Sequence, residues 1–263
     1  MIRIFSLIAL TIFALLSCQK AEEKQLNIAV AANMQFAMKE IARSFSDRTG
    51  TEIQLMISSS GKLNALIKEG APYDVFVSAD MKYPQDLYEL GLTENPPQIY
   101  AYGKLVLWTL WDDVEASLMA LVDSNTRHIA IANPKIAPYG LAAQQVLSYY
   151  GIEESTKNKL VFGESISQCN QFILSESAEL GFTAKSVVLS PQMKNQGDWI
   201  EINAESYIPI AQGVVIIRHK NRKVDAAKDF YRFLLSKEAQ DILLKFGYSV
   251  ENIDRSQDIV KKP

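Results

Sequence analysis

The chain has 263 residues, a formal net charge of −3 and 48% hydrophobic residues. A slightly acidic chain lacks the excess of Lys and Arg that nucleic-acid binding requires, so we expect no nucleic-acid partner. Without the first 25 residues, about 240 remain, which suffice to bury one large core or two smaller ones.

The N-terminus predicts an export signal. Residues 1–17 contain one charge, Arg3, and the apolar run 4–16, which is too short and too soon followed by polar sequence to span a membrane comfortably. We therefore predict a signal peptide at 1–17 and a polar tether at 18–25. With Cys18 set aside, Cys169 has no cysteine to pair with, so the exported domain must be stable on its core alone.

The end of the apolar run, Leu15-Leu16-Ser17-Cys18, resembles the lipobox of bacterial lipoproteins. The resemblance implies that a diacylglycerol is attached to Cys18, which becomes the first mature residue. The protein would then be exported and anchored to a membrane by this lipid, facing the periplasm or the cell exterior. The alternative is an ordinary signal peptide or a short membrane anchor with an incidental cysteine.

The first half of the mature chain alternates short apolar strands with amphipathic helices. We expect strands at 26–32, 53–57 and 73–77, because apolar residues alternate or run together there. Helices are predicted after the first two strands and from Pro84, ending at Gly50, Gly70 and Gly91. This order predicts an α/β fold with mainly parallel sheets flanked by helices.

A second lobe is predicted in the middle of the chain. A strong strand at 104–111 precedes this lobe. Within the lobe, strands and helices alternate again: we expect strands at 128–132, 160–162 and 180–184 and helices at 140–150 and 167–175. Another strong strand, 208–217, is followed by one long C-terminal helix with an apolar stripe.

The two long strands predict two crossings at a hinge. Lobe I would comprise 24–107 and 208–263, and lobe II 108–207, with the ligand cleft between them.

Four strand–helix loops place small polar residues or main-chain amides at helix starts: Asn33, Ser60-Gly61, Tyr139-Gly140 and Ser165-Ile166. A helix N-terminus has unpaired N–H groups and a partial positive charge. Several of them converging on one point would bind an anion without Lys or Arg. In open α/β sheets such loops lie at the carboxyl ends of the strands, where ligands bind.

Each of these residues also has an ordinary structural interpretation. Asn33 and Ser60 fit N-caps, Tyr139 a half-buried aromatic, and Ile166 a core residue. A phosphate loop around Gly61 is set aside, because Met56 and Leu63 occupy the positions that require glycine and Ser or Thr. A serine hydrolase is poorly supported, because the nucleophile-elbow glycines are missing around Ser60.

Other reactive side chains are assigned structural roles. His128 and His219 are expected at the surface and at a strand end rather than on a metal. Cys169 is expected to be a small hydrophobe in a helix. Asp74 and Asp80 could form an acid–base pair, but a hydrogen-bonding role near the hinge is favoured.

Blocks spread over nearly the whole mature chain resemble the molybdate-binding proteins of ABC transporters. They keep the family order, which is more specific than any single motif. They include Ala31-Ala32-Asn33-Met34, Ser59-Ser60-Gly61-Lys62-Leu63, Gly70-Ala71-Pro72-Tyr73-Asp74, Gly103-Lys104-Leu105-Val106-Leu107-Trp108, Ala137-Pro138-Tyr139-Gly140, Gly163-Glu164-Ser165-Ile166 and Tyr207-Ile208-Pro209-Ile210.

The resemblance implies a two-lobed periplasmic-binding-protein fold of type II and an oxyanion held by side-chain and backbone donors. Carried onto this chain, the ligand-binding residues are Asn33, Ser60, Tyr139 and Ile166, the last through its amide. Further candidates are Ala32, Gly61 and Ala184. At Ala184 some relatives have a ligand-binding tyrosine, and we expect Tyr139 to compensate through its hydroxyl or its amide.

The resemblance also implies the function: capture of molybdate, with tungstate, and delivery to an ABC permease with its ATPase. We expect a monomer with no enzymatic activity, no resident cofactor and no direct ligands for a metal cation. A binding protein for another oxyanion such as sulfate, or for a small carboxylate, remains the alternative. An enzyme on the same fold, such as a hydroxymethylbilane synthase, would need a cofactor-bearing cysteine and arginine clusters, and Cys169 has no arginine cluster nearby.

Overall fold

A computed structural model of the chain describes residues 25–219 and 225–250. The predicted signal peptide, Cys18 and most of the tether lie outside these ranges. Gln25, predicted as the last tether residue, is the first residue of a strand.

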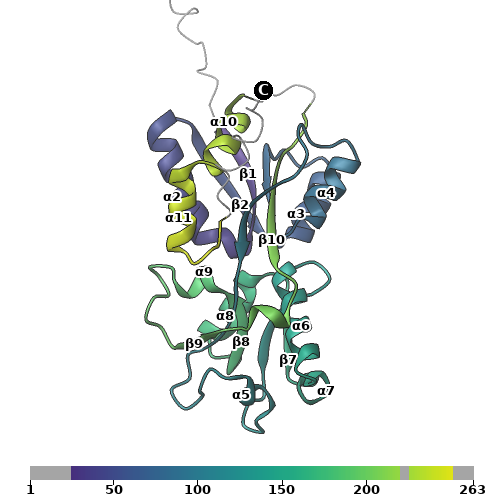
Figure 1. The fold of residues 1–263 in the computed structure, drawn as a ribbon, viewed down its shortest axis with the longest axis vertical. Coiled ribbons are helices and arrows are strands. Elements are labelled where there is room, and N and C mark those ends of the chain that lie inside the picture. The colour runs from purple at the N-terminus through teal and green to yellow at the C-terminus, as the bar shows by residue number, and fades with distance from the viewer. Residues whose placement is uncertain (1–24, 220–224, 251–263) are drawn as a thin grey trace, which may run out of the picture.

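The described chain alternates strands and helices (Figure 1). The strands are β1 (Gln25–Ala31), β2 (Glu52–Ser58), β3 (Val75–Val77), β4 (Gln98–Gly103), β5 (Leu105–Thr109), β6 (Ile129–Ala132), β7 (Leu160–Gly163), β8 (Leu180–Ala184), β9 (Asp198–Glu201) and β10 (Ile210–Ile216). The helices are η1 (Ala32–Met34), α2 (Gln35–Thr49), α3 (Ser60–Lys68), α4 (Lys82–Glu89), α5 (Leu118–Val122), α6 (Pro138–Tyr149), α7 (Glu153–Thr156), α8 (Ile166–Leu174), α9 (Lys185–Val188), η2 (Ala204–Ser206), α10 (Asp225–Leu234) and α11 (Lys237–Lys245).

The strands form two five-stranded mixed sheets, one in each lobe. The first has the order β2-β1-β3-β10-β4 and the second β7-β6-β8-β5-β9. In each sheet the first three strands are parallel, and the strand that enters from the other lobe is antiparallel to its neighbours. The lobes stack along the long axis of the molecule (Figure 1). The predicted α/β class with two lobes and mixed sheets flanked by helices is confirmed, although among the described strands only the pairs β1–β2, β1–β3, β6–β7 and β6–β8 are parallel.

The sheet of lobe I is covered on both faces. Ile28 and Val30 of β1 pack with α2, α10 and α11, whereas Ala29, between them, packs with α3 and α4. This alternation follows from the two-residue period of a strand. Because both faces are covered, the strand reads as a continuous apolar run rather than as alternating apolar and polar residues.

The first crossing lies earlier than predicted. The expected strand 104–111 is β5, and it is preceded by β4, which was not predicted as a strand. β4 pairs with β10 in the first sheet, while β5 pairs with β8 and β9 in the second. Residues 105–107, assigned to lobe I, therefore belong to the sheet of lobe II. β4 escaped prediction because, as an edge strand that is partly exposed, it has no clear apolar pattern.

The C-terminal helix is two helices rather than one. α10 ends at Leu234 and α11 begins at Lys237. The break is local in origin: the side chain of Ser236 accepts a hydrogen bond from the amide of Ala239 and caps α11. The predicted apolar stripe was right, because both helices bury the same side against α2 and the first sheet.

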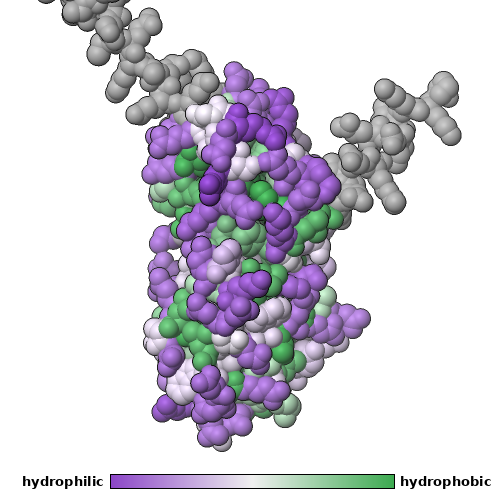
Figure 2. All heavy atoms as spheres, turned by 90° about the vertical axis from the view of Figure 1, so that its left-hand side faces the viewer, coloured by the Kyte–Doolittle hydropathy of each residue, from purple (hydrophilic) through white to green (hydrophobic). Residues whose placement is uncertain are grey.

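The surface on the side of α2 and α11 is mostly hydrophilic, with apolar residues scattered over it (Figure 2). Scattered apolar residues are ordinary on a folded domain. Within 25–219 and 225–250, none of the helices combines the length and the apolar character that a bilayer span needs.

Candidate functional site

A small cavity between the lobes brings the four predicted ligand-binding residues together. Asn33, Ser60, Tyr139 and Ile166 all line it, and each is at most 4% exposed. The other lining residues are Ala31, Ala32, Ser59, Ala79, Ala137 and Pro138, so none of the residues around the cavity carries a charge. The cavity has room for one compact group and not for a large organic ligand.

Four helix starts surround this cavity, and none of them is capped by a side chain. They are the starts of η1 with α2, and of α3, α6 and α8. Elsewhere serines do cap: Ser117 and Ser236 accept from the amides of α5 and α11. The serines at the N-cap positions of α3 and α8, Ser59 and Ser165, do not. Helix starts without a side-chain cap can offer main-chain amides to a bound anion, although the amides of Gly61 and Gly140 already donate to the carbonyl oxygens of Ile136 and Ala137.

Two serine hydroxyls add side-chain donors. Ser60 Oγ accepts a hydrogen bond from the amide of Ala79 at 2.9 Å, which leaves its proton to donate elsewhere. Ser59 Oγ is buried and has no hydrogen-bond partner among the residues that the structure describes. A buried hydroxyl without a partner is costly, and from its position on the cavity wall Ser59 Oγ could donate to a bound group.

Asn33 is held by a buried network rather than pointing freely at the cavity. Its Nδ2 donates to Gln212 Oε1 and to the hydroxyl of Tyr248, both at 3.0 Å. The main-chain carbonyl oxygen of Asn33 accepts a hydrogen bond from Ser186 Oγ at 2.7 Å. Both protons of the side-chain amide are thus used within the protein. The main-chain amides of η1 are what this loop offers to an anion.

The network continues to Tyr139 and Tyr100. Gln212 Nε2 donates to the Tyr139 hydroxyl at 3.2 Å, and the Tyr100 hydroxyl donates to Gln212 Oε1 at 2.7 Å. Burial raises the pKa of both tyrosines well above the ordinary value, and the neighbouring Tyr248 adds to this. Burial likewise raises the pKa of Tyr248. A raised pKa keeps a phenol protonated, so these hydroxyls remain neutral at physiological pH.

Two of the further candidates lie away from the cavity. The amide of Gly61 donates across the cleft to the carbonyl oxygen of Ile136 at 2.9 Å, so it is not available to a ligand. Ala184 is the last residue of β8, paired with Leu105, and is fully buried in the sheet of lobe II. Ala32 lines the cavity. The sequence spacing of residues does not tell which first-turn amide stays free, because the other lobe can supply an acceptor for it, as Ile136 does for Gly61.

The lobes are in contact across the cleft. Besides the bond from Gly61, the Tyr83 hydroxyl donates to the carbonyl oxygen of Lys135 at 3.2 Å. At the rim, Lys62 of lobe I forms an exposed ion pair with Glu164 of lobe II at 3.0 Å. The structure is therefore that of a closed clamp.

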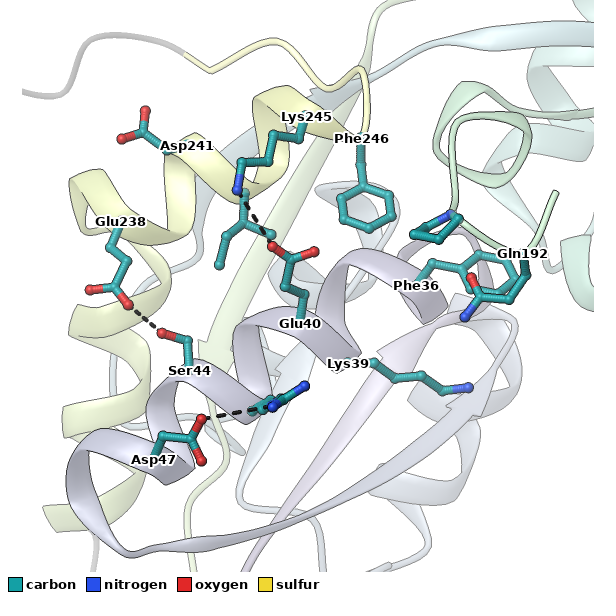
Figure 3. A pocket seen from close by; sticks show the side chains of 13 residues that line it. Phe36, Lys39, Glu40, Ser44, Asp47, Gln192, Glu238, Asp241, Lys245 and Phe246 are labelled. Carbon is teal, nitrogen blue, oxygen red and sulfur yellow. Dashed lines mark hydrogen bonds and ion pairs between the residues drawn. The ribbon is translucent and has the colours of Figure 1, made fainter. Parts of the chain in front are cut away.

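A larger groove lies on the outer face of α2 and α11 (Figure 3). It measures about 780 Å³ and is lined by acidic and basic side chains that pair with each other. Glu40 pairs with Lys245 at 3.6 Å, Arg43 with Asp47 at 3.8 Å, and Ser44 bonds Glu238. The carboxylates would repel an anion, so this groove is not the oxyanion site.

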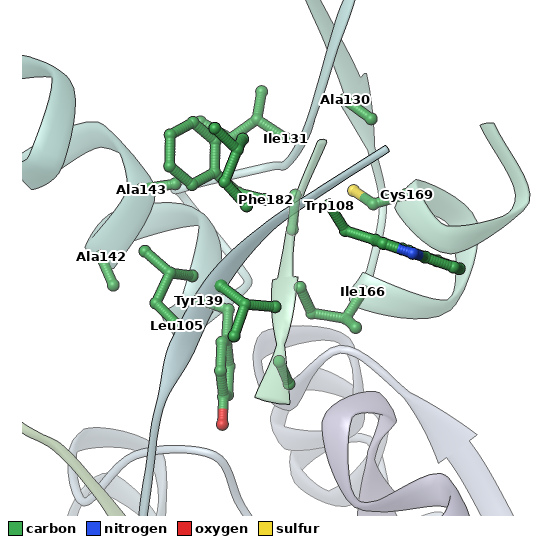
Figure 4. Close-up of a cluster of buried hydrophobic side chains, with 14 of the residues drawn as sticks. Leu105, Trp108, Ala130, Ile131, Tyr139, Ala142, Ala143, Ile166, Cys169 and Phe182 are labelled. Atoms are coloured by element: carbon green, nitrogen blue, oxygen red, sulfur yellow. The ribbon is translucent and has the colours of Figure 1, made fainter. Parts of the chain in front are cut away.

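The remaining reactive residues have structural roles. Cys169 lies in the core of lobe II beside Ile166 and Trp108 (Figure 4), and burial raises the pKa of its thiol to about 12. The predicted role of a small hydrophobe is confirmed. The predicted hydrogen-bonding roles of the two aspartates are also confirmed: Asp74 accepts from the amide of Asn27 at 2.7 Å, and Asp80 from Ser78 Oγ at 2.9 Å.

Sequence reasoning missed the residues behind the cavity. Gln212, Tyr100, Tyr248 and Ser186 are buried and polar, and all join the network around Asn33. Ser59 was not predicted as a ligand-binding residue. A glutamine within the otherwise apolar strand 208–217 is the one signal that was available, because an unpaired polar residue in a buried strand is unfavourable.

Two lobes joined by two crossings, with an uncharged, donor-lined cavity between them, define a two-lobed solute-binding protein with the type II periplasmic fold. Residues 26–249 match the bacterial extracellular solute-binding protein family. The chain belongs to this family.

The relatives agree with the predicted resemblance. The molybdate-binding protein of Azotobacter vinelandii is 37% identical over 239 residues, covering 90% of this chain and 94% of that protein. The molybdate-binding protein of Rhodobacter capsulatus is 37% identical over 224 residues, covering 85% and 87%. The solved structure of the Azotobacter vinelandii periplasmic protein matches with a TM-score of 0.81 at 33% identity, over 86% of this chain and 99% of that one.

A sulfate-binding protein from Mycobacterium tuberculosis matches with a TM-score of 0.71 over 89% of this chain and 90% of that one. Its identity to this chain is only 9%, so the two share the fold alone. Fold does not decide the ligand, which depends on the donors in the site.

Proposed function

We propose that this protein captures molybdate, and also tungstate, outside the cytoplasm and delivers it to an ABC permease with its ATPase. The observation that carries the proposal is the convergence of four uncapped helix starts on one uncharged cavity between two lobes. The 37% identity to two molybdate-binding proteins over most of the chain supports the same ligand. We propose that the protein acts as a monomer, without a resident cofactor and without changing its ligand chemically.

In this proposal the ligand is held by donors from both lobes. Lobe I contributes the amides at Ala32 and Asn33 and the hydroxyl of Ser60. Lobe II contributes Tyr139 and the amide of Ile166. Each lies on the wall of the cavity. Because both lobes supply donors, the ligand favours the closed arrangement.

Neutral donors select a fully deprotonated tetrahedral dianion. Molybdate has only hydrogen-bond acceptors. In a cavity lined by N–H and O–H donors, each of its oxygens can therefore accept a hydrogen bond. Phosphate keeps a proton near neutral pH, and that proton needs an acceptor which a donor-only site does not supply. Sulfate has the right charge but shorter bonds, so the size of the cavity must discriminate against it. Tungstate is nearly the same size as molybdate and is not excluded.

A calorimetric titration tests the function. We expect the mature protein to bind molybdate and tungstate at least about 100-fold more tightly than sulfate, with phosphate weaker still. Saturating molybdate should also raise the melting temperature by several degrees, because it binds only the native state. A preference for sulfate would support the alternative oxyanion, and a melting temperature indifferent to molybdate and tungstate would contradict the proposal.

Two matched serine variants test whether molybdate binds in the cavity. Ser59 Oγ and Ser190 Oγ are both buried without a hydrogen-bond partner among the described residues, but only Ser59 lines the cavity. Ser59→Ala should weaken molybdate binding about tenfold, because it removes a donor to the ligand. It should leave the melting temperature of the unliganded protein unchanged, since no protein group loses a partner. Ser190→Ala should alter neither; equal affinities in both variants would place the ligand elsewhere.

We further propose that the protein is a lipoprotein anchored at Cys18. The lipobox-like residues before Cys18 support this, and the family is extracellular. Cys18→Ser should move the protein from the membrane fraction of the cells to the soluble fraction. Cys169→Ser is the matched control and should fractionate as the parent, because Cys169 is buried in the core. Membrane association that survives Cys18→Ser would rule out the anchor.

A further inference from the structure

Gln212 is a fully buried amide in β10, the strand that enters lobe I from the second crossing. The pairing of β10 with β4 shifts register between Gln212 and Gly213. An irregularity of this kind re-aims a side chain within a sheet. Here it places a polar side chain behind the cavity, where the lobes meet.

Both the acceptor and the donor of the Gln212 side-chain amide form hydrogen bonds with residues that we propose to bind the ligand. Its Oε1 accepts from Asn33 of lobe I at 3.0 Å, and its Nε2 donates to the Tyr139 hydroxyl of lobe II at 3.2 Å. Tyr100 also donates to Oε1 at 2.7 Å. An amide offers an acceptor and a donor side by side without a charge at every physiological pH, whereas a carboxyl group does so only when it is protonated. Glutamate, methionine or leucine at this position would lose one or both bonds.

The surroundings leave room for this contact. Gly103 lies at the first crossing, and a Cβ atom there would lie 2.0 Å from the Tyr139 hydroxyl oxygen and 2.5 Å from Gln212 Nε2. Any other residue would push the two groups apart. The absence of a side chain at Gly103 therefore makes the bond between the lobes possible, which is a second observation independent of the bond itself.

We propose that Gln212 is a positioning residue that holds Asn33 and Tyr139 in register across the hinge and keeps the site donor-only. The proposal rests on the oxyanion function above. Because Gln212 donates to the Tyr139 hydroxyl, that oxygen acts as the acceptor and its own proton is directed away from Gln212. Because Gln212 accepts from Asn33, the loop that presents the amides of η1 is fixed.

Gln212→Glu tests this through the pH dependence of binding. A protonated glutamic acid is nearly isosteric with glutamine and still has one donor and one acceptor, whereas the carboxylate has only acceptors and adds a negative charge. Burial raises the pKa of such a carboxyl group. The groups that face it are Asn33, Tyr100 and Tyr139, with Tyr248 bonded to Asn33, and all of them stay neutral.

Affinity for molybdate is measured by calorimetry at about pH 5.5 and about pH 8.5, each relative to the parent at the same pH. We expect Gln212→Glu to lose about 100-fold at the higher pH and to recover to within about tenfold at the lower pH. Gln212→Met has neither the donor nor the acceptor of the amide, so it should lose affinity equally at both pH values. A ratio for Gln212→Glu that does not change with pH would overturn the proposal.

Gln240→Glu is the matched control. Gln240 is a buried glutamine of lobe I in α11 that does not line the cavity, so its replacement should leave affinity unchanged at both pH values. If Gln212→Glu unfolds at the higher pH, a double-mutant cycle of Gln212→Met with Tyr139→Phe replaces it. Coupled effects on affinity support the bond, and independent ones overturn it. A parent protein that fails to bind molybdate instead refutes the proposed function.

Discussion

Asn33→Asp should abolish molybdate binding, with a loss of affinity of at least about 1000-fold. Asn33 lies on the wall of a cavity without charged residues and is only 1% exposed. A carboxylate there would face a dianion at a few ångströms, with little water between them. The two side chains have almost the same shape, so the packing is preserved, and the loss combines the added charge with the loss of the two hydrogen bonds that Nδ2 donates to Gln212 and Tyr248. Calorimetry measures the affinity, and circular dichroism checks the fold.

Acid should partly restore binding to Asn33→Asp, since burial raises the pKa of the introduced carboxyl group and the neutral form no longer repels the ligand. Asn170→Asp serves as the control. Asn170 is a buried residue of α8 whose Oδ1 already accepts from Thr183 at 2.6 Å, and it does not line the cavity. We expect it to change affinity by less than about tenfold. Molybdate binding by Asn33→Asp at the parental level would remove Asn33 from the site.

Gly61→Leu should hold the lobes apart and weaken binding at least about 100-fold. A Cβ at Gly61 would lie 2.9 Å from Cα and Cβ of Ile136 in the other lobe, and 2.7 Å from the Tyr83 hydroxyl. The main chain of Ile136 cannot move aside as a side chain can, so the closed form becomes scarce. Apparent affinity then falls in proportion to the fraction of closed protein. Small-angle scattering should show that molybdate compacts the parent and not the variant.

Lys62→Leu is the control for Gly61→Leu. It changes the next residue and removes the ion pair with Glu164, but both side chains of that pair are more than half exposed. An exposed ion pair contributes little, so we expect affinity to change by no more than about threefold. If Gly61→Leu compacts with molybdate as the parent does, the contact between Gly61 and Ile136 does not limit closure.

The two variants test different parts of one mechanism. Asn33→Asp acts on the recognition of the anion, and Gly61→Leu on the closure that brings the donors of both lobes together. A clamp of this kind needs both, because the cavity is completed only when the lobes meet. The absence of a cationic partner in the cavity wall also suits a protein that must release its ligand to a permease.

The local sequence determined the secondary structure and the four helix starts of the site. Apolar periodicity and Gly or Pro boundaries are set by neighbours in the chain, so the predicted strands and helices were largely right. Asn33, Ser60, Tyr139 and Ile166 were predicted in the same way, because each lies where a strand passes into a helix and the direction of first-turn amides is a local property, and the structure places all four on one cavity. The resemblance to molybdate-binding proteins then restricted the anion.

Only the tertiary structure decided which residues line the cavity and which lie behind it. Gln212 meets Asn33 across 179 positions of sequence, and Tyr248 meets it across 215. The amide of Gly61, a further candidate for the site, instead donates to the carbonyl oxygen of Ile136 in the other lobe. Hydrogen-bond partners so far apart in the chain leave no periodic signal, since their pairing depends on how two separately folded lobes meet. The first crossing was missed for another reason: β4, which precedes it, is a partly exposed edge strand without a clear apolar pattern.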